Sequence, residues 1–321
     1  MNAPRLGIFS PGSPSPPAAL KQGLRWLSDR GFACVLGRTA IGGEGLHAGP
    51  PEARAADLHR LLADPGVDAV LCTRGGSGSL GLLPYLDFEA AVRAGKPLIG
   101  MSDVTALHLA LYGRGLHGIS GAMVVQLDAQ TAAYTAERWL ALVSARPSGA
   151  QTKPAPLLPM PAGAAPRPLP QTGPSGRTGT SVAGVEGPLL PCNLSLLAAL
   201  VGTPFLPSLA GTILVLEDIH ETPQSIDRML AQLTLSGVDR QPAGLVLGQF
   251  TACLPRGDNV TEADGRQRLW QWAGSLGVPA LVDFPYGHEP VTCALPFGAR
   301  ARLTLDPPGL QLLESPFGAG A

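Results

Sequence analysis

Ser102 lies where a short apolar strand is expected to turn directly into a helix. Pro97–Gly100 has the pattern of a buried strand, and Val104, Leu107 and Leu111 recur at helical spacing. A serine at such a turn can act as a nucleophile, because the helix N-terminus behind it offers backbone N–H groups to a developing oxyanion. Serine is also a favoured helix N-cap, and only half of a G-x-S-x-G elbow is present. The segment alone leaves both interpretations open.

A glycine-rich loop follows another predicted buried strand and contains a literal G-x-G-x-x-G at Gly76, Gly78 and Gly81. One interpretation is a dinucleotide site, with Asp103 about 20 residues further on as the ribose-binding carboxylate. Pro84 opposes this, because it would break the helix whose N-terminus should hold the pyrophosphate. A second interpretation is an oxyanion-hole loop, in which glycine lets backbone N–H groups approach a reacting carbonyl. A simple tight turn is the third.

A serine nucleophile needs a base, and His288 has the most suggestive context of the six histidines. It follows a predicted strand on the glycine-bearing loop Pro285–Pro290, which can face a cleft. Ordinary surface placement remains an alternative. Of the other histidines, His47 and His59 are interpreted as surface residues and His108 as a core residue. His117 and His220 have no distinguishing context.

The base in turn needs an orienting carboxylate. Glu217 and Asp218 end the apolar strand Ile213–Leu216, and a carboxylate at a strand end is held rigidly. Helix capping or a salt bridge would explain these residues equally well. Glu221 is a nearby competitor, less favoured because a strand end is stiffer than the loop after it.

The elements that must position these residues alternate between strand and helix in the first half of the chain, which predicts a parallel sheet covered by helices on both faces. Ligands of such sheets bind beyond the carboxyl ends of the strands, where Ser102 falls. The predicted strands are Leu6–Ser10, Ala33–Gly37, Val67–Cys72 and Pro97–Gly100, with helices around residues 20–27, 51–63 and 88–94 between them.

Nine prolines between Pro147 and Pro174 predict an extended connector, either a passive linker or a flap over a cleft. The expected organisation is therefore an α/β domain over 1–146, a Pro-rich linker over 147–179 and a mixed α/β domain over 180–321. The second domain is expected to contain helices at Asn193–Val201, Ser225–Leu235 and Gln267–Leu276 and strands at Gly211–Leu216, Gly244–Phe250 and Pro279–Phe284.

The composition of the 321 residues is that of a globular chain, with 45% hydrophobic residues and a formal net charge of −1. This argues against disorder and against nucleic acid as a partner. The sequence shows no secretory signal pattern and no apolar stretch long enough for a membrane span, so a soluble cytoplasmic protein is expected. The five scattered cysteines predict neither a zinc site nor a disulfide framework.

Several segments of the chain, which follow one another in the order found in that family, together resemble the LD-carboxypeptidase family. Its members are the muramoyl-tetrapeptide carboxypeptidases of cytoplasmic cell-wall recycling. The resemblance covers most of the chain outside the proline-rich connector. The matching stretches are Arg74–Gly78 with Leu83–Asp87, Ile99–Leu111, Asn193–Leu197 with Gly202–Thr203, Leu214–Glu221 with Ile226–Leu230, and Gly287–His288 with Leu295–Gly298.

The resemblance implies a serine peptidase with the triad Ser102, Glu217 and His288. Ser102 would attack the peptide carbonyl, His288 would relay its proton to the leaving amine, and Glu217 would hold the imidazole. The backbone N–H groups of Gly76 and Asp103 would form the oxyanion hole. The family needs no metal or organic cofactor. Its partner here would be a small murein peptide, and a homodimer is a candidate assembly.

This chain departs from the family pattern at several positions. The family usually has an aromatic residue where Ser77 stands and an arginine near Gly81, and both could shape the substrate side of the site. Pro191 and Cys192 replace paired glycines, and His220 occupies a position that is usually small. None of these changes removes the triad, so hydrolase chemistry is expected even if the preferred peptide differs.

The leading functional hypothesis is a serine carboxypeptidase that releases terminal D-alanine from the L,D bond of a murein tetrapeptide. The alternative within the same chemistry is a self-immunity peptidase that cleaves an acyl linkage on a nucleotide-like toxin of the microcin type. From other classes come a nucleotide-binding protein that uses Gly76, Gly78 and Gly81, and a binding protein without turnover.

Overall fold

The computed structural model describes residues 3–43, 45–144, 158–169, 184–254 and 260–314. Their contacts divide the chain into two compact units, each described here by itself. The first unit contains the described residues up to 144 together with Cys293–Gly298, and the second contains those from 158 to 292 together with Ala299–Glu314. The predicted division into two α/β domains is confirmed at this level.

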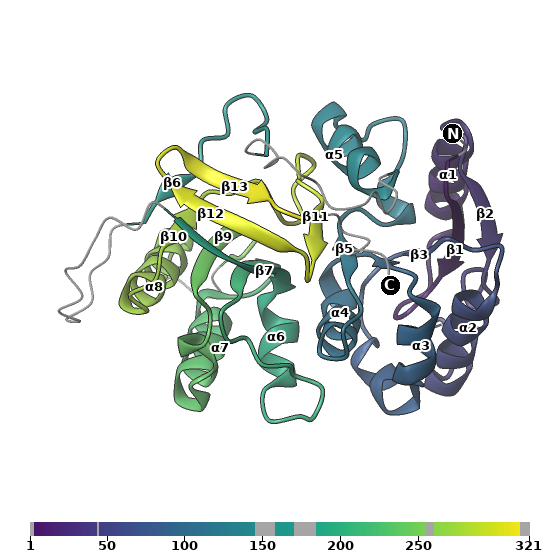
Figure 1. Cartoon of the computed structure of the whole chain (residues 1–321), viewed down its shortest axis with the longest axis horizontal. Coiled ribbons are helices and arrows are strands. Elements are labelled where there is room, and N and C mark those ends of the chain that lie inside the picture. Colours follow the sequence, from purple (N-terminus) through teal and green to yellow (C-terminus); the bar gives the residue numbers. More distant parts are fainter. Residues whose placement is uncertain (1–2, 44, 145–157, 170–183, 255–259, 315–321) are drawn as a thin grey trace. The chain divides into compact units, whose positions relative to one another are not determined.

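The first unit is built on a six-stranded sheet with the strand order β11-β5-β4-β3-β1-β2 (Figure 1). β1 to β5 are mutually parallel, and β11 runs antiparallel to β5. The parallel sheet predicted from the alternating pattern is therefore present. The strands are β1 (Arg5–Phe9), β2 (Ala33–Leu36), β3 (Ala69–Cys72), β4 (Leu98–Ile99), β5 (Gly118–Ser120) and β11 (Leu295–Phe297).

The helices of the first unit follow its strands in the order expected for βαβ units. Central strands such as β3 are buried at every residue, as is typical of a parallel sheet. Local signals set the helix ends: the Asp87 side chain caps α3, and Gly95 ends it with a φ of +63°. The helices are α1 (Pro17–Ser28), α2 (Pro51–Ala63), α3 (Phe88–Ala94), α4 (Thr105–Tyr112) and α5 (Ala133–Val143), with short 3₁₀ helices η1 (Leu80–Tyr85), η2 (Ser102–Val104) and η3 (Val124–Gln126).

The second unit contains a seven-stranded mixed sheet with the order β13-β12-β7-β8-β9-β10-β6. β7 to β10 are parallel, whereas β12, β13 and β6 pair antiparallel at its two sides. The mixed α/β character predicted for this half is confirmed. The strands are β6 (Arg167–Pro168), β7 (Gly184–Asn193), β8 (Ile213–Ile219), β9 (Gly244–Thr251), β10 (Ala280–Val282), β12 (Arg300–Leu305) and β13 (Pro308–Leu312).

Helices connect the parallel strands of the second unit. The side chain of Thr222 caps the start of α7 (Pro223–Ser236), and Pro223 occupies its first position. Gly237, whose φ is +74°, forms the C-cap of this helix. Ile226, Leu230 and Leu233 form its buried face, as the sequence spacing predicts. The helices are α6 (Leu194–Leu200), α7 (Pro223–Ser236), α8 (Glu262–Ser275) and the 3₁₀ helix η4 (Val238–Arg240).

Two features of the chain path differ from the expected linear division. Residues of β11, which lie late in the sequence, belong to the sheet of the first unit. Most of the expected 147–179 linker lies outside the described residues, but its described part, residues 158–169, contributes β6 to the second sheet. The boundaries at 146 and 180 stay a prediction.

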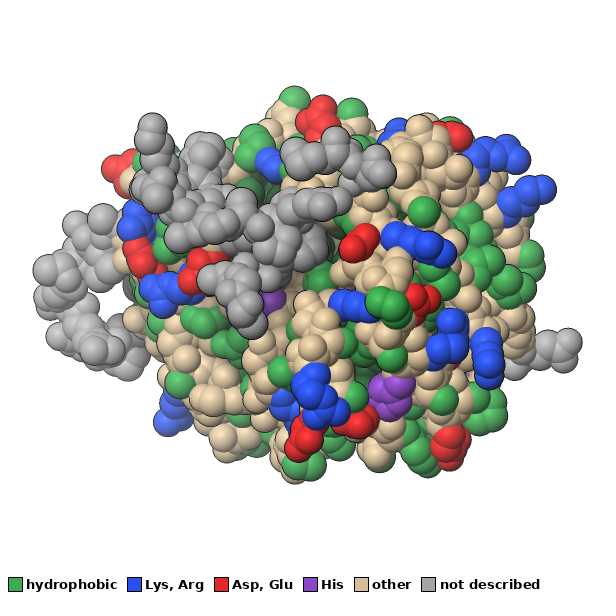
Figure 2. Space-filling view, turned by 45° about the vertical axis from the view of Figure 1, so that its right-hand side comes forward, with side chains coloured by type: hydrophobic (Ala, Val, Ile, Leu, Met, Phe, Trp, Pro, Cys, Tyr) green, Lys and Arg blue, Asp and Glu red, His purple; other side chains and the backbone are tan. Residues whose placement is uncertain are grey.

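The surface carries charges of both signs. On the face drawn in Figure 2, basic and acidic side chains are interspersed, in keeping with the formal net charge of −1. Among the described helices, none combines the length and the apolar composition that crossing a bilayer requires.

Candidate active site

Ser102 occupies a turn between the buried strand β4 and helix α4, as predicted. Its backbone lies in the left-handed region with a φ of +62°, which costs a non-glycine residue free energy and is often retained at functional sites. Ser102 is the first residue of η2, whose N-cap is Met101, and α4 is capped at Val104 without a side-chain hydrogen bond. The interpretation of Ser102 as a helix N-cap is therefore wrong.

Gly75 lies directly against this serine and immediately precedes Gly76, whose part in an oxyanion hole stays a prediction. A Cβ atom built on Gly75 would stand 3.2 Å from the Ser102 Cβ and 3.3 Å from the Asp103 backbone nitrogen. A side chain would therefore crowd the space beside the hydroxyl. Gly76 has a φ of +88° and packs against Ser13, where a Cβ would lie 2.7 Å from the Ser13 Cβ. The loop thus brings its backbone next to Ser102 only because it lacks side chains there.

Two buried charged side chains hold the far end of this loop. Asp103 accepts hydrogen bonds from the Ser79 backbone N–H at 2.9 Å and from its hydroxyl at 2.7 Å. Arg54 is only 2% exposed, and its guanidinium donates to the Gly78 carbonyl at 3.1 Å. It also donates to the carbonyls of Pro11 and of Gly49, which lies two positions before the start of α2. Three loops of the first unit are therefore fixed to one another through Arg54.

His288 and Glu217 form a direct contact within the second unit. The His288 Nδ1 and the Glu217 Oε2 lie 2.6 Å apart, the distance of a strong charge-assisted hydrogen bond. The Glu217 side chain is fully buried and that of His288 is 12% exposed. The carboxylate that contacts His288 is therefore Glu217, while the competitor Glu221 lies beyond the end of β8. Glu217 and Asp218 belong to β8 itself, because the strand runs to Ile219, further than the sequence predicts.

Glycines at two close approaches place the His288 loop against β9. Gly248 leaves room for the carbonyl of Tyr286, which accepts a hydrogen bond from the Gln249 backbone N–H at 2.8 Å. Gly287 has a φ of +150° and packs on Gln249. The Gln249 side chain then donates to the Val291 carbonyl at 3.0 Å and accepts from the Glu289 N–H at 3.2 Å. The loop is thereby held on both sides of His288.

A buried polar network supports Glu217 from behind. The Asn193 Nδ2 donates to the Glu217 Oε1 at 3.2 Å and to the Asp218 Oδ1 at 2.9 Å. The Asn193 Oδ1 accepts from the backbone N–H of Leu196 and from the hydroxyl of Ser195, which fixes the orientation of the amide. Each Glu217 oxygen therefore has its own donor.

This network changes two pKa values. Burial lowers the pKa of His288, but the hydrogen bond to Glu217 and the charges of Glu217 and Asp218 outweigh burial, so the pKa lies above the usual 6.5. Burial, with the neighbouring charge of Glu217, raises the pKa of Asp218 to about 6. The imidazole thus stands in an environment that stabilises its protonated form.

The dinucleotide interpretation of the glycine loop is wrong. The loop is followed by the six-residue 3₁₀ helix η1, which contains Pro84, and not by an α-helix that could hold a pyrophosphate. Asp103, the expected ribose ligand, is 3% exposed and is engaged by Ser79. Gly81 has open space around it.

His108 and the cysteines were the other residues whose chemistry the sequence left to be placed. His108 is 2% exposed, its Nε2 lies 3.0 Å from the Gly100 carbonyl, and burial lowers its pKa to about 4, so it is a core histidine as predicted. All five cysteines are free thiols. Among the described residues, no group of three or more His, Cys, Asp or Glu side chains could hold a metal ion.

The structure thus brings Ser102, Asp103 and the glycine loop together in the first unit, and Glu217 and His288 together in the second. Their catalytic roles stay a prediction. Sequence reasoning missed Gly75, Arg54 and the Asn193 network. Asn193 carried the one usable signal, because an asparagine directly before an apolar helical run is a typical N-cap.

The chain matches the profiles of two known domains. The LD-carboxypeptidase N-terminal domain matches residues 6–121, and the LD-carboxypeptidase C-terminal domain matches residues 186–303. The first match includes Ser102 and the second includes both Glu217 and His288.

Individual relatives are similar over nearly the whole chain. The murein tetrapeptide carboxypeptidase of Pseudomonas aeruginosa is 33% identical over 93% of this chain and 92% of its own length. The microcin C7 self-immunity protein of Escherichia coli is 25% identical over 96% of this chain and 93% of its own. The crystal structure of muramoyltetrapeptide carboxypeptidase from Oxalobacter formigenes superposes with a TM-score of 0.75 at 28% identity, covering 96% of this chain and 97% of that one.

Proposed function

Because the chain belongs to the LD-carboxypeptidase family and is thus a carboxypeptidase, a hydrolase of the serine type, we propose that it releases D-alanine from murein tetrapeptide. The bond cleaved is the L,D-peptide bond before the terminal residue, and the reaction serves cytoplasmic recycling of the cell wall. The observation that carries the proposal is the buried 2.6 Å contact between His288 and Glu217, together with the left-handed turn at Ser102.

In the proposed mechanism, Ser102 is the nucleophile and His288 the general base. Glu217 holds the Nδ1 proton of the imidazole, which leaves Nε2 free to accept the Ser102 proton as the hydroxyl oxygen attacks the carbonyl carbon. His288 then gives that proton to the amine of the leaving D-alanine, and an acyl-enzyme ester remains on Ser102. A water molecule, deprotonated by His288, hydrolyses the ester and restores the serine.

The oxyanion would be stabilised by backbone N–H groups beside Ser102. Gly76 and Asp103 are the proposed donors, and Gly75 keeps the space between loop and hydroxyl open. Preorganised donors of this kind contribute on the order of 3 to 4 kcal/mol each to transition-state stabilisation. The left-handed φ of Ser102 supports a nucleophile elbow that dispenses with the second glycine, since Val104 is already helical.

Two tetrapeptides that differ only in the stereochemistry of the terminal alanine test the proposal. Purified enzyme is incubated with each peptide, and the released alanine is quantified by chiral chromatography. The expected result is release from the L,D peptide and none from its L,L counterpart. No release from either peptide, or equal release from both, would contradict the proposed specificity.

A second candidate is a self-immunity peptidase that cleaves an acyl linkage on a nucleotide-like toxin. The similarity to the microcin C7 self-immunity protein supports it, as does Ser77, which stands where the family usually has an aromatic residue. Competition between the tetrapeptide and an aminoacyl-sulfamoyl adenosine separates the two functions. Inhibition of D-alanine release by micromolar nucleotide conjugate, with hydrolysis of the conjugate itself, would favour the second.

A further inference from the structure

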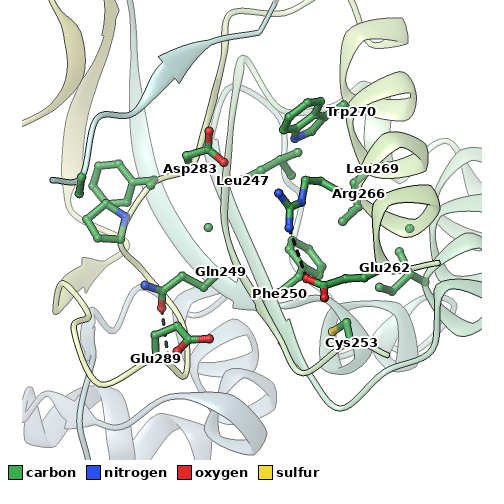
Figure 3. A pocket seen from close by; sticks show the side chains of 16 residues that line it. Leu247, Gln249, Phe250, Cys253, Glu262, Arg266, Leu269, Trp270, Asp283 and Glu289 are labelled. Carbon is green, nitrogen blue, oxygen red and sulfur yellow. Dashed lines mark hydrogen bonds and ion pairs between the residues drawn. The ribbon is translucent and has the colours of Figure 1, made fainter. Parts of the chain in front are cut away.

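Neighbouring segments hold the loops that carry the proposed catalytic groups. In the second unit, the Gln249 side chain on β9 accepts a hydrogen bond from the Glu289 N–H and so fixes the residue after His288, as Figure 3 shows. In the first unit, the segment between β1 and α1, residues 10–16, supports the glycine loop in a comparable way. This β1 loop brings Ser13 against Gly76, the residue whose N–H is a proposed oxyanion donor.

The β1 loop and the glycine loop lie together because their strands are neighbours in the sheet. β1 and β3 pair in parallel, with Phe9 opposite Cys72, so both chains leave the sheet at the same edge. Gly12 then lets the two backbones approach closely, since a Cβ atom on it would stand 2.8 Å from the Ser77 carbonyl oxygen and 2.9 Å from that of Gly75. This close approach places the next residue of the β1 loop within hydrogen-bond distance of the glycine loop.

Ser13 binds the peptide groups on both sides of Gly76. The Ser13 backbone N–H donates to the Gly75 carbonyl, with 3.3 Å between nitrogen and oxygen. That carbonyl belongs to the same planar peptide group as the Gly76 N–H, and in a trans peptide the two point in opposite directions. The Ser13 hydroxyl oxygen accepts a hydrogen bond from the Ser77 N–H at 3.2 Å, which fixes the next peptide group. One residue therefore sets the direction of the Gly76 N–H from both sides.

Gly76 depends on such a contact because glycine restricts its own backbone least. Its φ of +88° is one of many values that an unrestrained glycine can adopt, and the residue before it is also a glycine. Arg54 holds the loop two positions further on, at the Gly78 carbonyl. Displacement of a catalytic group by about 1 Å can cost on the order of 100-fold in rate, so the direction of this N–H matters for the transition state.

We propose that Ser13 is a positioning residue for catalysis, which directs the Gly76 N–H toward the oxyanion of the transition state. The assignment rests on the function proposed above, in which Gly76 is an oxyanion donor. Ser13 acts through the glycine loop, so its loss should lower the rate of acyl transfer and leave substrate affinity unchanged. Ser13→Ala isolates this role, because it removes the acceptor of the Ser77 N–H and keeps the backbone hydrogen bond to Gly75.

The test measures kcat and KM for D-alanine release from the L,D tetrapeptide. We expect Ser13→Ala to lower kcat about tenfold and to keep KM within about twofold of the wild type. The expected loss is smaller than the roughly 100- to 1,000-fold that removal of an oxyanion donor costs, because the backbone hydrogen bond remains. Ser13→Thr keeps a hydroxyl group and should restore kcat to within about threefold of the wild type.

Ser15→Ala is the matched control for this substitution. Ser15 lies two positions further along the β1 loop, and its buried hydroxyl has no hydrogen-bond partner among the residues that the structure describes. The control should therefore keep wild-type kcat, and urea denaturation shows whether each variant is folded in the assay. Unchanged kcat in folded Ser13→Ala would overturn the assignment, as would an equal loss in Ser15→Ala or in Ser13→Thr.

Acetylation of Ser102 by p-nitrophenyl acetate separates this outcome from failure of the proposed function. Attack on this ester forms an oxyanion at the same serine but involves no D-alanine, and the modified peptide is quantified by mass spectrometry. Acetylation that is about tenfold slower in Ser13→Ala, without D-alanine release by the wild type, supports the assignment and refutes the peptidase function. Wild-type D-alanine release with equal acetylation and equal kcat in Ser13→Ala refutes the assignment alone. A wild type that shows neither reaction contradicts both.

Discussion

Replacing Glu217 by glutamine should remove most of the activity by changing which imidazole nitrogen carries the proton. Asn193 is the reason. Its Nδ2 donates to the Glu217 Oε1, so the amide oxygen of the new glutamine must face Asn193. The NH₂ group of the glutamine then faces the His288 Nδ1, 2.6 Å from the replaced oxygen, and can only donate to it. The proton moves to Nε2, which can no longer accept one from Ser102.

The expected loss in kcat is about 10⁴-fold, the effect of the same carboxylate-to-amide change in other Ser-His-carboxylate enzymes. It corresponds to about 5.4 kcal/mol of transition-state free energy. The free energy of unfolding should change by less than about 1 kcal/mol. The glutamine side chain has the same volume as that of Glu217 and keeps the hydrogen bond from Asn193, and because it is uncharged it does not repel Asp218. The pKa of His288 should fall, since its main stabilising partner loses its charge.

The assay combines D-alanine release, urea denaturation and an NMR titration of His288. Glu221→Gln is the matched control, since Glu221 lies four positions further along the chain and should keep wild-type kcat. A Glu217→Gln variant that retains kcat within tenfold of the wild type would refute this role of Glu217, as would a Glu221→Gln variant that loses as much activity as Glu217→Gln.

Three further outcomes follow from the geometry. The kcat/KM of the enzyme should fall as the pH drops through a value above 6.5, because His288 must be neutral to accept a proton and its pKa is raised. Asp218→Asn removes one of the charges that raise the pKa of His288, so the acid limb of the pH profile should move to lower pH. Arg54→Met should lower the free energy of unfolding by about 2–4 kcal/mol in urea denaturation, because the buried carbonyl of Pro11 and the partly buried carbonyls of Gly49 and Gly78 lose their donor. Arg54→Lys should recover only part of that loss, and wild-type stability in Arg54→Met would disprove the anchoring role. Ser102→Gly should have a free energy of unfolding about 1 kcal/mol higher than Ser102→Ala, because glycine adopts a φ of +62° without strain. Equal free energies of unfolding for these two variants would show that the turn is unstrained.

The sequence was sufficient for the elements that depend on local pattern. Alternating strands and helices predict the parallel sheet of the first unit, and the spacing around Ile226 predicts the buried face of α7. The turn at Ser102 could also be located, because an apolar strand and an apolar helix flank it so closely. In each case the signal lies within about 15 residues of chain.

Features that depend on distant contacts could not be predicted. Glu217 and His288 meet across 71 positions, and no local pattern marks their pairing. β11 joins the sheet of the first unit although its sequence neighbours belong to the second. Arg54 looks like a surface residue of an amphipathic helix, yet tertiary packing buries it. The pairing of β11 depends on its partner strand, and the burial of the Arg54 charge depends on three carbonyl acceptors. Such contacts can be identified only in the folded chain.

Attack of the Ser102 hydroxyl on the peptide bond is the step on which the proposed mechanism depends. The most direct measurement is the rate of D-alanine release by Ser102→Ala, compared with the wild type at equal enzyme concentration and after both have been shown to unfold at similar urea concentrations. We expect a loss of at least about 10⁴-fold in kcat, because no other group takes the place of the nucleophile. Release within tenfold of the wild-type rate would contradict it.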